Sequence, residues 1–143
     1  MTVRSGNEAI VEEAVRFYVK TVINADDRLA SNIWQDGPKT TMIHPRGEDI
    51  GWDAIRQHFY IDRLQKLYTE RNFTIENLDI ECYSKHAVVT FTWHLKGKLR
   101  SDGTEVEHHG RTSQIYRHRS TGRWQIIHTH VSGMPIASER QSI

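Results

Sequence analysis

Two imidazoles near the end of the chain have the residue type and spacing that could do chemistry. His128 and His130 lie in the segment 122–135 (GRWQIIHTHVSGMP), whose alternation predicts a strand. Side chains two residues apart on a strand share a face, so Trp124, Ile126, His128 and His130 are expected together. Two imidazoles could begin a zinc site, but neither carboxylate nor cysteine lies nearby in the sequence to complete it. We therefore expect no metal, and we assign both histidines to a subunit interface.

A third imidazole, His94, belongs to a strand with one apolar and one polar face. Thr92 and His94 share the polar face, opposite Phe91 and Trp93. Such a face is either solvated or lines a pocket. An unperturbed imidazole titrates near pH ~6.5 and can accept a proton at neutral pH. We therefore treat His94 as a candidate base and Thr92 as a candidate ligand-binding residue.

Other kinds of catalytic residue have little support in the sequence. Cys82 is the only cysteine, which excludes an internal disulfide and fits a reducing compartment. The serines lack a Gly-flanked elbow, and the glycines do not form a phosphate-binding loop. No cofactor is expected. The four tryptophans suit a core or an interface, although one that lines an apolar cavity would suit an aromatic ligand, and we count Trp34 as a candidate for that role.

Composition limits the class of partner. The 143 residues fit one domain, 1–143, with a core at about 7–135. With 19 Lys+Arg against 18 Asp+Glu there is no basic surface for nucleic acid. No apolar run reaches the roughly 18 residues that a membrane span needs, so we expect a cytoplasmic protein with neither a nucleic-acid nor a membrane partner.

The spacing of apolar residues predicts helices first and strands afterwards. Asn7 is expected to cap the first helix, and Asp26 or Asp27 the second, which Gly37-Pro38 would end. The segment between Pro45 and Gly51 is rich in turn residues. The expected elements in this half are a helix at 8–24, a short helix after 26 or 27, a strand at 40–44 and a helix at 52–67.

From Phe73 onward the period changes to two. The strand 73–83 changes its apolar face near Glu76-Asn77, which predicts a bulge there. Asp102-Gly103 then turns the chain into a strand at 105–118. Helices followed by long antiparallel strands predict an α+β domain, with the helices on one side of a curved sheet.

The last two strands also carry a family resemblance. Residues 109–119 (HGRTSQIYRHR) and 122–135 together resemble the end of the association domain of calcium/calmodulin-dependent protein kinase II and SnoaL-like proteins of the nuclear transport factor 2-like superfamily. The resemblance implies a cone-shaped α+β fold with a pocket at its open end. It also implies an outer sheet face that pairs with another subunit.

A second resemblance lies in the N-terminal half. Residues 15–26 (VRFYVKTVINAD) and 42–59 (MIHPRGEDIGWDAIRQHF) resemble ketosteroid isomerase. Tyr18 then falls at the position of the tyrosine that stabilises the oxyanion, and His44 at that of the general-base aspartate. The second oxyanion donor of the isomerase has no counterpart. A helix residue at Tyr18 and a surface-turn residue at His44 are the alternative.

The kinase resemblance also suggests what the pocket binds. In that domain arginines enter the pocket, and the alignment puts His94, Gln114 and Val131 at three of their positions. With those guanidinium groups replaced, the ligand is expected to be neutral or weakly polar. Arg111 has the opposite strand parity to Gln114, and we assign it to the rim or the subunit interface.

Taken together, the resemblances imply a small-molecule-binding SnoaL-like protein. One hypothesis is an isomerase, cyclase or lyase that uses general acid-base chemistry on a mostly apolar molecule, with His44 or His94 as base and Tyr18 as donor. The alternative is a non-catalytic oligomeric binding or assembly module. A third is an iota-class carbonic anhydrase-like activity, because those proteins have a similar His-rich ending. Strand faces that carry Phe91, Trp93 and Trp124 favour a homodimer or a larger assembly.

Overall fold

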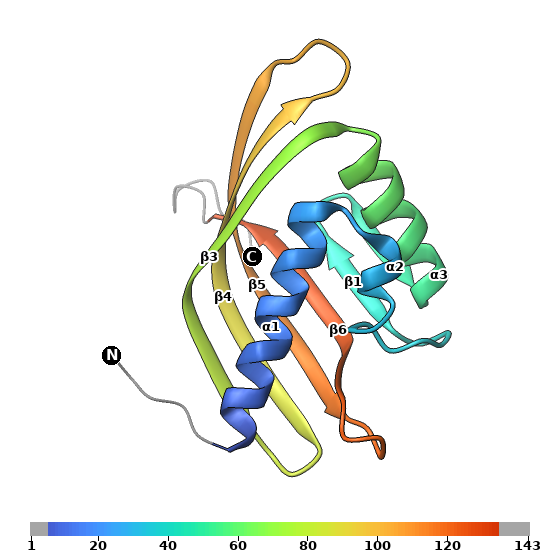
Figure 1. Cartoon of the computed structure of the whole chain (residues 1–143), viewed down its shortest axis with the longest axis vertical. Helices are drawn as coiled ribbons and strands as arrows, with labels where there is room; N and C mark the ends of the chain where they lie inside the picture. Colours follow the sequence, from blue (N-terminus) through green and yellow to red (C-terminus); the bar gives the residue numbers. More distant parts are fainter. Residues whose placement is uncertain (1–5, 135–143) are drawn as a thin grey trace, which may run out of the picture.

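The computed structural model describes residues 6–134 and places three helical segments against one curved sheet (Figure 1). The helices are α1 (Asn7–Asn24), α2 (Asp27–Ala30) and α3 (Trp52–Ile55), which continues as the π-helix η1 (Arg56–Gln65). The strands are β1 (Thr41–His44), β2 (Gly47–Ile50), β3 (Tyr68–Cys82), β4 (His86–Leu99), β5 (Glu105–His118) and β6 (Trp124–Gly133). No helix in the described part of the chain is long and apolar enough to cross a membrane.

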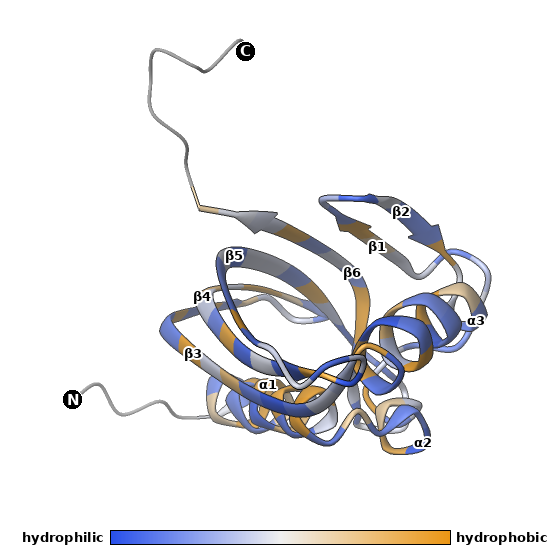
Figure 2. Ribbon diagram, turned by 90° about the horizontal axis from the view of Figure 1, so that it is seen from above, coloured by the Kyte–Doolittle hydropathy of each residue, from blue (hydrophilic) through white to orange (hydrophobic). Residues whose placement is uncertain are grey.

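The sheet has six strands in the order β2-β1-β6-β5-β4-β3. All neighbours are antiparallel except β1 and β6, which pair in parallel because α3 and the strands after it separate them in the chain. Seen from above, the helices gather on one side of the curved sheet (Figure 2). The α+β class and the helical layer predicted from the sequence are therefore confirmed.

The helix ends and turns show where local sequence signals were sufficient to predict the boundary of an element. Asp26 caps α2 by accepting a hydrogen bond from the Leu29 N–H at 2.9 Å. Helix α1 begins within one residue of its predicted start, but Gly6 occupies the N-cap position, so Asn7 is not the cap. The segment predicted to be only a turn contains a strand, β2, which forms a hairpin with β1.

The core lies where α1 crosses the inner face of the sheet and meets α3 and η1. Trp34 stacks on Trp52, with ring centroids 5.9 Å apart, and its indole N–H donates to the Tyr60 hydroxyl at 2.9 Å. The hydroxyl groups of Tyr60 and Thr21 lie 2.8 Å apart, also hydrogen-bonded. Because each of these polar atoms has a partner, the tryptophan and tyrosine rings can be fully buried.

Two irregularities decide which strand residues face the core. The register of β3 against β4 shifts between Glu76 and Asp79, and Asn77 has a φ of 55°, as the predicted bulge requires. A second shift was not predicted. On β6, Ile126 pairs with Tyr116 and His128 with Ile115, which leaves Ile127 as an extra residue.

The bulge at Ile127 corrects the predicted face of β6. Before it, Trp124 and Ile126 point into the core. After it, the inner face carries Thr129, whereas His128 and His130 lie on the outer face. The two histidines do share a face, but not with the tryptophan and isoleucine.

The apolar strand residues that favoured a dimer are covered within one chain. Phe91 is 3% exposed and Trp124 is 4% exposed, and half-buried Trp93 packs against the same core. Phe91 and Trp124 therefore leave almost no apolar surface for a second subunit to cover, and these two side chains do not support the predicted self-association.

Candidate active site

A pocket of about 310 Å³ lies between the helices and the inner face of the sheet. Its walls are apolar where α1, η1 and the strands meet, and polar at the hairpin β1–β2. The apolar residues of the lining are Val22, Met42, Phe59, Leu64, Phe73, Trp93, Leu95 and Val131. An apolar cavity with a few polar groups at one side is the usual form of a small-molecule site.

One carboxylate holds two imidazoles at the polar side. Asp49, from β2, has a side chain only 9% exposed. One of its oxygens, Oδ2, lies 3.0 Å from Nε2 of His44, and the other, Oδ1, lies 2.7 Å from Nδ1 of His58 on η1. All three residues line the pocket. The carboxylate therefore fixes the position of a strand imidazole and a helix imidazole at once.

The hydrogen bonds also assign the ring protons. Nδ1 of His44 accepts the backbone N–H of Arg46 at 3.2 Å, so His44 carries its proton on Nε2 and donates it to Asp49. Because Nδ1 of His58 donates to the other carboxylate oxygen, Nε2 of His58 keeps its lone pair when the ring is neutral. The hydrogen bond to Asp49 and its negative charge both raise the pKa of His58 above 6.5. His58 is thus a proton acceptor whose tautomer is set by a buried carboxylate.

Tyr18, on α1, also lines this pocket. The ring is 2% exposed, and it packs edge-on against Trp34 and Phe73. Burial raises the pKa of the Tyr18 hydroxyl well above 10. The group therefore stays protonated at neutral pH and can donate a hydrogen bond.

Two guanidinium groups make the polar side of the pocket positive. Arg46 follows β1, and half-buried Arg63 lies on η1. Within residues 6–134 neither forms an ion pair. The Arg46 charge is close enough to Tyr68 to oppose the rise that burial causes in the pKa of its hydroxyl. These cations offer a place for an acidic or carbonyl oxygen of a ligand.

The tryptophan wall of the pocket depends on a glycine. Trp93 and Gly110 are paired across β4 and β5, and a Cβ at position 110 would overlap both the Trp93 ring and the Ser132 carbonyl. The indole Nε1 of Trp93 is buried and has no hydrogen-bond partner among the described residues. Gly110 therefore lets the indole lie flat against β5 beside the pocket.

The structure brings together some of the residues singled out from the sequence and separates others. Tyr18, His44 and Val131 line one pocket. His94 and Thr92 instead lie on the outer face of the sheet, opposite His109 and Arg111 of β5.

Two further candidates lie in the protein interior, outside the pocket lining. Gln114 is fully buried, and its Oε1 accepts the Tyr116 hydroxyl at 2.8 Å. Trp34 is fully buried in the core beside Trp52. Of the two alternative bases, His44 therefore shares the pocket with Tyr18 and His94 does not, and the expected pocket positions of Gln114 and Trp34 are not what the structure shows.

The three residues assigned to an interface lie together on the outer face. Arg111 and His130 border an open depression of about 540 Å³ that Thr92, Ser113 and Ser132 also line. His128 lies beside them, and burial, followed by the neighbouring His130, lowers its pKa.

Sequence reasoning missed Asp49 and His58. Finding Asp49 required the β1–β2 hairpin, which was not predicted. In that hairpin Asp49 pairs with Met42 on the inner face of β1, the face that His44 also occupies. His58 precedes Phe59 on a segment of helical spacing and carried no separate signal.

The arrangement can be compared with known proteins. The SnoaL-like domain profile matches residues 11–137. A nuclear transport factor 2-like superfamily protein from Salmonella enterica subsp. enterica serovar Typhimurium str. LT2 superposes with a TM-score of 0.91 at 27% identity, covering 96% of this chain and 100% of that one. A ketosteroid isomerase-like protein from Erwinia carotovora atroseptica gives 0.73 at 16% identity, with 90% and 96% covered. A hexachlorocyclohexane dehydrochlorinase gives 0.75 at 20% identity, with 92% and 90% covered. Curated protein sequences gave no match.

The fold is that of the nuclear transport factor 2-like superfamily, as the sequence resemblance implied. Because the profile covers most of its length, the chain belongs to the SnoaL-like family within it.

Proposed function

We propose that this protein is an enzyme that moves a proton on a small, mostly apolar organic molecule by general acid-base chemistry. The observation that carries the proposal is Asp49, which holds His44 and His58 at the edge of a pocket that Tyr18 also lines. Isomerases, cyclases and lyases share such a proton abstraction as a step. The dehydrochlorinase and isomerase-like structures with this fold are consistent with that range.

The roles follow from the protons already assigned. His58, with a free Nε2 and a carboxylate on its other nitrogen, acts as the base that takes a proton from carbon. His44 donates to Asp49, and it can accept a proton only by giving up the Arg46 N–H, so it serves as the second base or as a positioning residue. Tyr18, kept protonated, donates to the oxygen on which charge develops.

The proposed substrate has an apolar body and one acidic or carbonyl end. The expectation of a neutral ligand depended on His94 and Gln114 standing where arginines would be, and neither lines the pocket. Arg46 and Arg63 do line it, beside a largely apolar wall. A monocarboxylate with an aromatic or alicyclic body matches both surfaces, whereas a dicarboxylate would bury a second charge against apolar side chains.

The test is a thermal-shift screen followed by turnover measurements on the compounds that bind. Arylalkyl monocarboxylates should raise the melting temperature more than their neutral amides and more than short dicarboxylates. For the compounds that bind, removal of a proton from carbon is measured as its exchange for deuterium in deuterated water. Wild type should exchange, and Tyr18→Phe and His58→Gln should lose most of the rate at unchanged fold. His86→Gln, an exposed histidine remote from the pocket, is the control. Exchange that survives in both pocket variants would overturn the proposed roles.

A binding or assembly module is the second proposal, and the outer face favours it. The depression bordered by Arg111 and His130 is open, and the helices lie on the other side of the sheet (Figure 2). We propose that a homodimer or larger assembly forms through this polar face. Light scattering of wild type and of Arg111→Glu measures the mass: a dimer that dissociates in the variant supports the interface, and a monomeric wild type near 16.7 kDa would remove it.

A further inference from the structure

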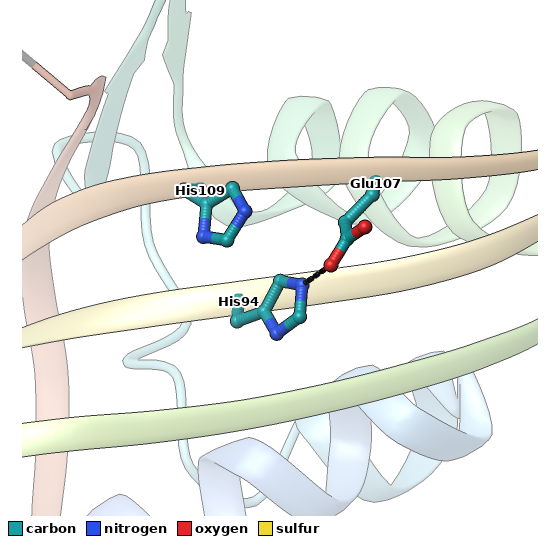
Figure 3. A group of neighbouring side chains, drawn as sticks. All are labelled: His94, Glu107 and His109. Carbon is teal, nitrogen blue, oxygen red and sulfur yellow. Dashed lines mark hydrogen bonds and ion pairs between the residues drawn. The ribbon is translucent and has the colours of Figure 1, made fainter.

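A second group of two histidines and a carboxylate lies on the outer face of the sheet, and only one of its members, His109, also borders the pocket. His94 on β4 pairs directly with His109 on β5, and Glu107 comes two residues before His109 on the same face. Nε2 of His94 is hydrogen-bonded to Oε1 of Glu107 (Figure 3). The two imidazole rings stack with centroids 4.3 Å apart and an angle of 6° between their planes. Three potential ligand atoms thus come from adjacent positions of one rigid ladder.

The donor set matches that of an open zinc site. One atom from each of the three side chains lies within 4.8 Å of the others, the one such group among residues 6–134. Zinc bound by two histidines and a carboxylate places each ligand about 2.0–2.2 Å from the metal, so tetrahedral ligands lie about 3.4 Å apart. The three atoms need to approach one another by about 1.4 Å at most. Side-chain rotation can supply this movement because His94 and Glu107 are partly exposed.

We propose that His94, Glu107 and His109 bind a divalent transition-metal ion, with zinc as the ion of choice and water at the fourth position. In the metal-free group the Nε2 proton of His94 occupies the place between nitrogen and carboxylate that the cation takes. On binding, that proton moves to Nδ1 through solvent, the ring remains neutral, and Glu107 exchanges a hydrogen bond for a metal bond. The stack opens so that His109 presents a ring nitrogen to the same ion.

Neighbouring charged side chains determine the affinity for a metal ion that we expect at this site. Lys96 stands directly across from Glu107, and Arg111 lies two residues beyond His109, both on the outer face. Glu105, two residues before Glu107, adds negative charge on that face. The cations oppose binding, so the site should be weaker than a buried site with four protein ligands. His94 and Glu107 lie outside the lining of the pocket, whereas the third ligand, His109, also borders it.

The experiment uses the full chain without a polyhistidine tag, stripped with a chelator and titrated with Zn²⁺ by calorimetry and with Co²⁺ by visible absorption. One ion per chain is expected, with the intense visible bands of tetrahedral Co²⁺. His94→Gln, His109→Gln and Glu107→Gln should each weaken binding at least about tenfold. The double variant His128→Gln/His130→Gln, which removes the other outer histidine pair, should leave affinity unchanged.

Circular dichroism of each variant separates loss of a ligand from loss of the fold. Absence of binding to folded wild type, or equal binding by wild type and folded His94→Gln, would overturn the proposed site. The cluster would then be only a cross-strand hydrogen bond. Loss of binding only in the His128/His130 double variant would assign the ion to that pair instead. Metal binding is measured without substrate, and His94 and Glu107 do not line the pocket, so this proposal and the proposed function fail separately.

Discussion

Two clusters of two histidines and one carboxylate lie on opposite faces of the same sheet, and they differ in where the carboxylate stands. In the pocket, Asp49 is 9% exposed and lies between His44 and His58, each on a different oxygen. On the outer face, Glu107 is 49% exposed and reaches only His94, whose ring stacks on that of His109.

The difference shows how the same side chains are directed to different chemistry. A buried carboxylate between two imidazoles fixes their protons, because each of its oxygens is already hydrogen-bonded to a ring nitrogen, and leaves one nitrogen free to act on a bound molecule. A solvated carboxylate at the end of a histidine stack does not hold both rings in one protonation pattern. Its lone pairs and those of the rings stay available to a cation. Residue type alone would not have distinguished the two clusters.

The largest expected effect is that of Asp49→Asn. The amide offers one acceptor oxygen to two N–H donors, so one imidazole loses its partner and its tautomer is no longer fixed. Turnover on any substrate identified should fall by about 100-fold or more, and the free energy of unfolding by about 1–3 kcal/mol. Steady-state kinetics and urea melts measure both. Asp36→Asn, at an exposed residue, is the control and should change neither turnover nor stability. Full activity of Asp49→Asn would show that the buried carboxylate is not needed for the chemistry of the pocket.

Gly110→Ala tests whether the pocket wall is as tightly built as the packing indicates. The added methyl group would overlap the Trp93 ring and the Ser132 carbonyl, so both the indole and the β6 backbone must shift. Overpacking of this kind costs about 1–3 kcal/mol, and ligand binding should weaken as well. Gly133→Ala is the matched control, because a Cβ there meets no atom within 4 Å. Equal melting temperatures for the two variants would contradict the close fit.

The pH dependence of stability should identify the Asp49–His58 pair. Asp49 raises the pKa of His58 above 6.5, so the folded protein holds the proton more tightly than the unfolded chain does. The stabilisation is fully present below about pH 6.5 and is lost as the pH rises through the raised pKa of the folded state. The melting temperature of His58→Gln should therefore fall furthest below wild type at about pH 5.5 and approach it at about pH 8.5. A difference that grows with pH would reverse the assignment.

The smallest effect should come from the outer cluster. Removing an exposed cross-strand pair changes stability by less than about 1 kcal/mol, so metal-free His94→Gln should melt close to wild type. It should also exchange substrate protons at the wild-type rate. Chemical melts and the exchange assay check both, and a loss of exchange in His94→Gln would mean that the two faces are coupled.

Regular elements with clear end signals could be predicted from the sequence. The Asp102-Gly103 turn placed β5 at Glu105–His118, the bounds that the structure has. The apolar spacing of α1 placed that helix within one residue of its ends. The bulge in β3 was visible because the apolar parity changes there.

The features that build the site had weaker signals. The β2 strand has only four residues, Gly47–Ile50, within a segment of turn formers, so its pairing comes from the β1 hairpin, and Asp49 was missed with it. The extra residue of β6 left no trace in the pattern, because Ile126 and Ile127 are both apolar and alternation cannot tell which is inserted. His58 depends on a π-helix, η1, which an apolar spacing read as 3.6 residues per turn does not reveal.

The extra residue at Ile127 divides β6 into parts that tolerate change differently. Upstream, Trp124 and Ile126 are packed into the core, where a smaller side chain leaves a cavity and lowers stability. Downstream, Val131 and Gly133 border the pocket. Substitutions in this second part alter the shape of what can be held while the packed part keeps the chain folded. Thr129, just beyond the bulge, is still buried, so new ligand preferences are expected from changes at Val131 and Gly133, the end of the strand that holds no core residue.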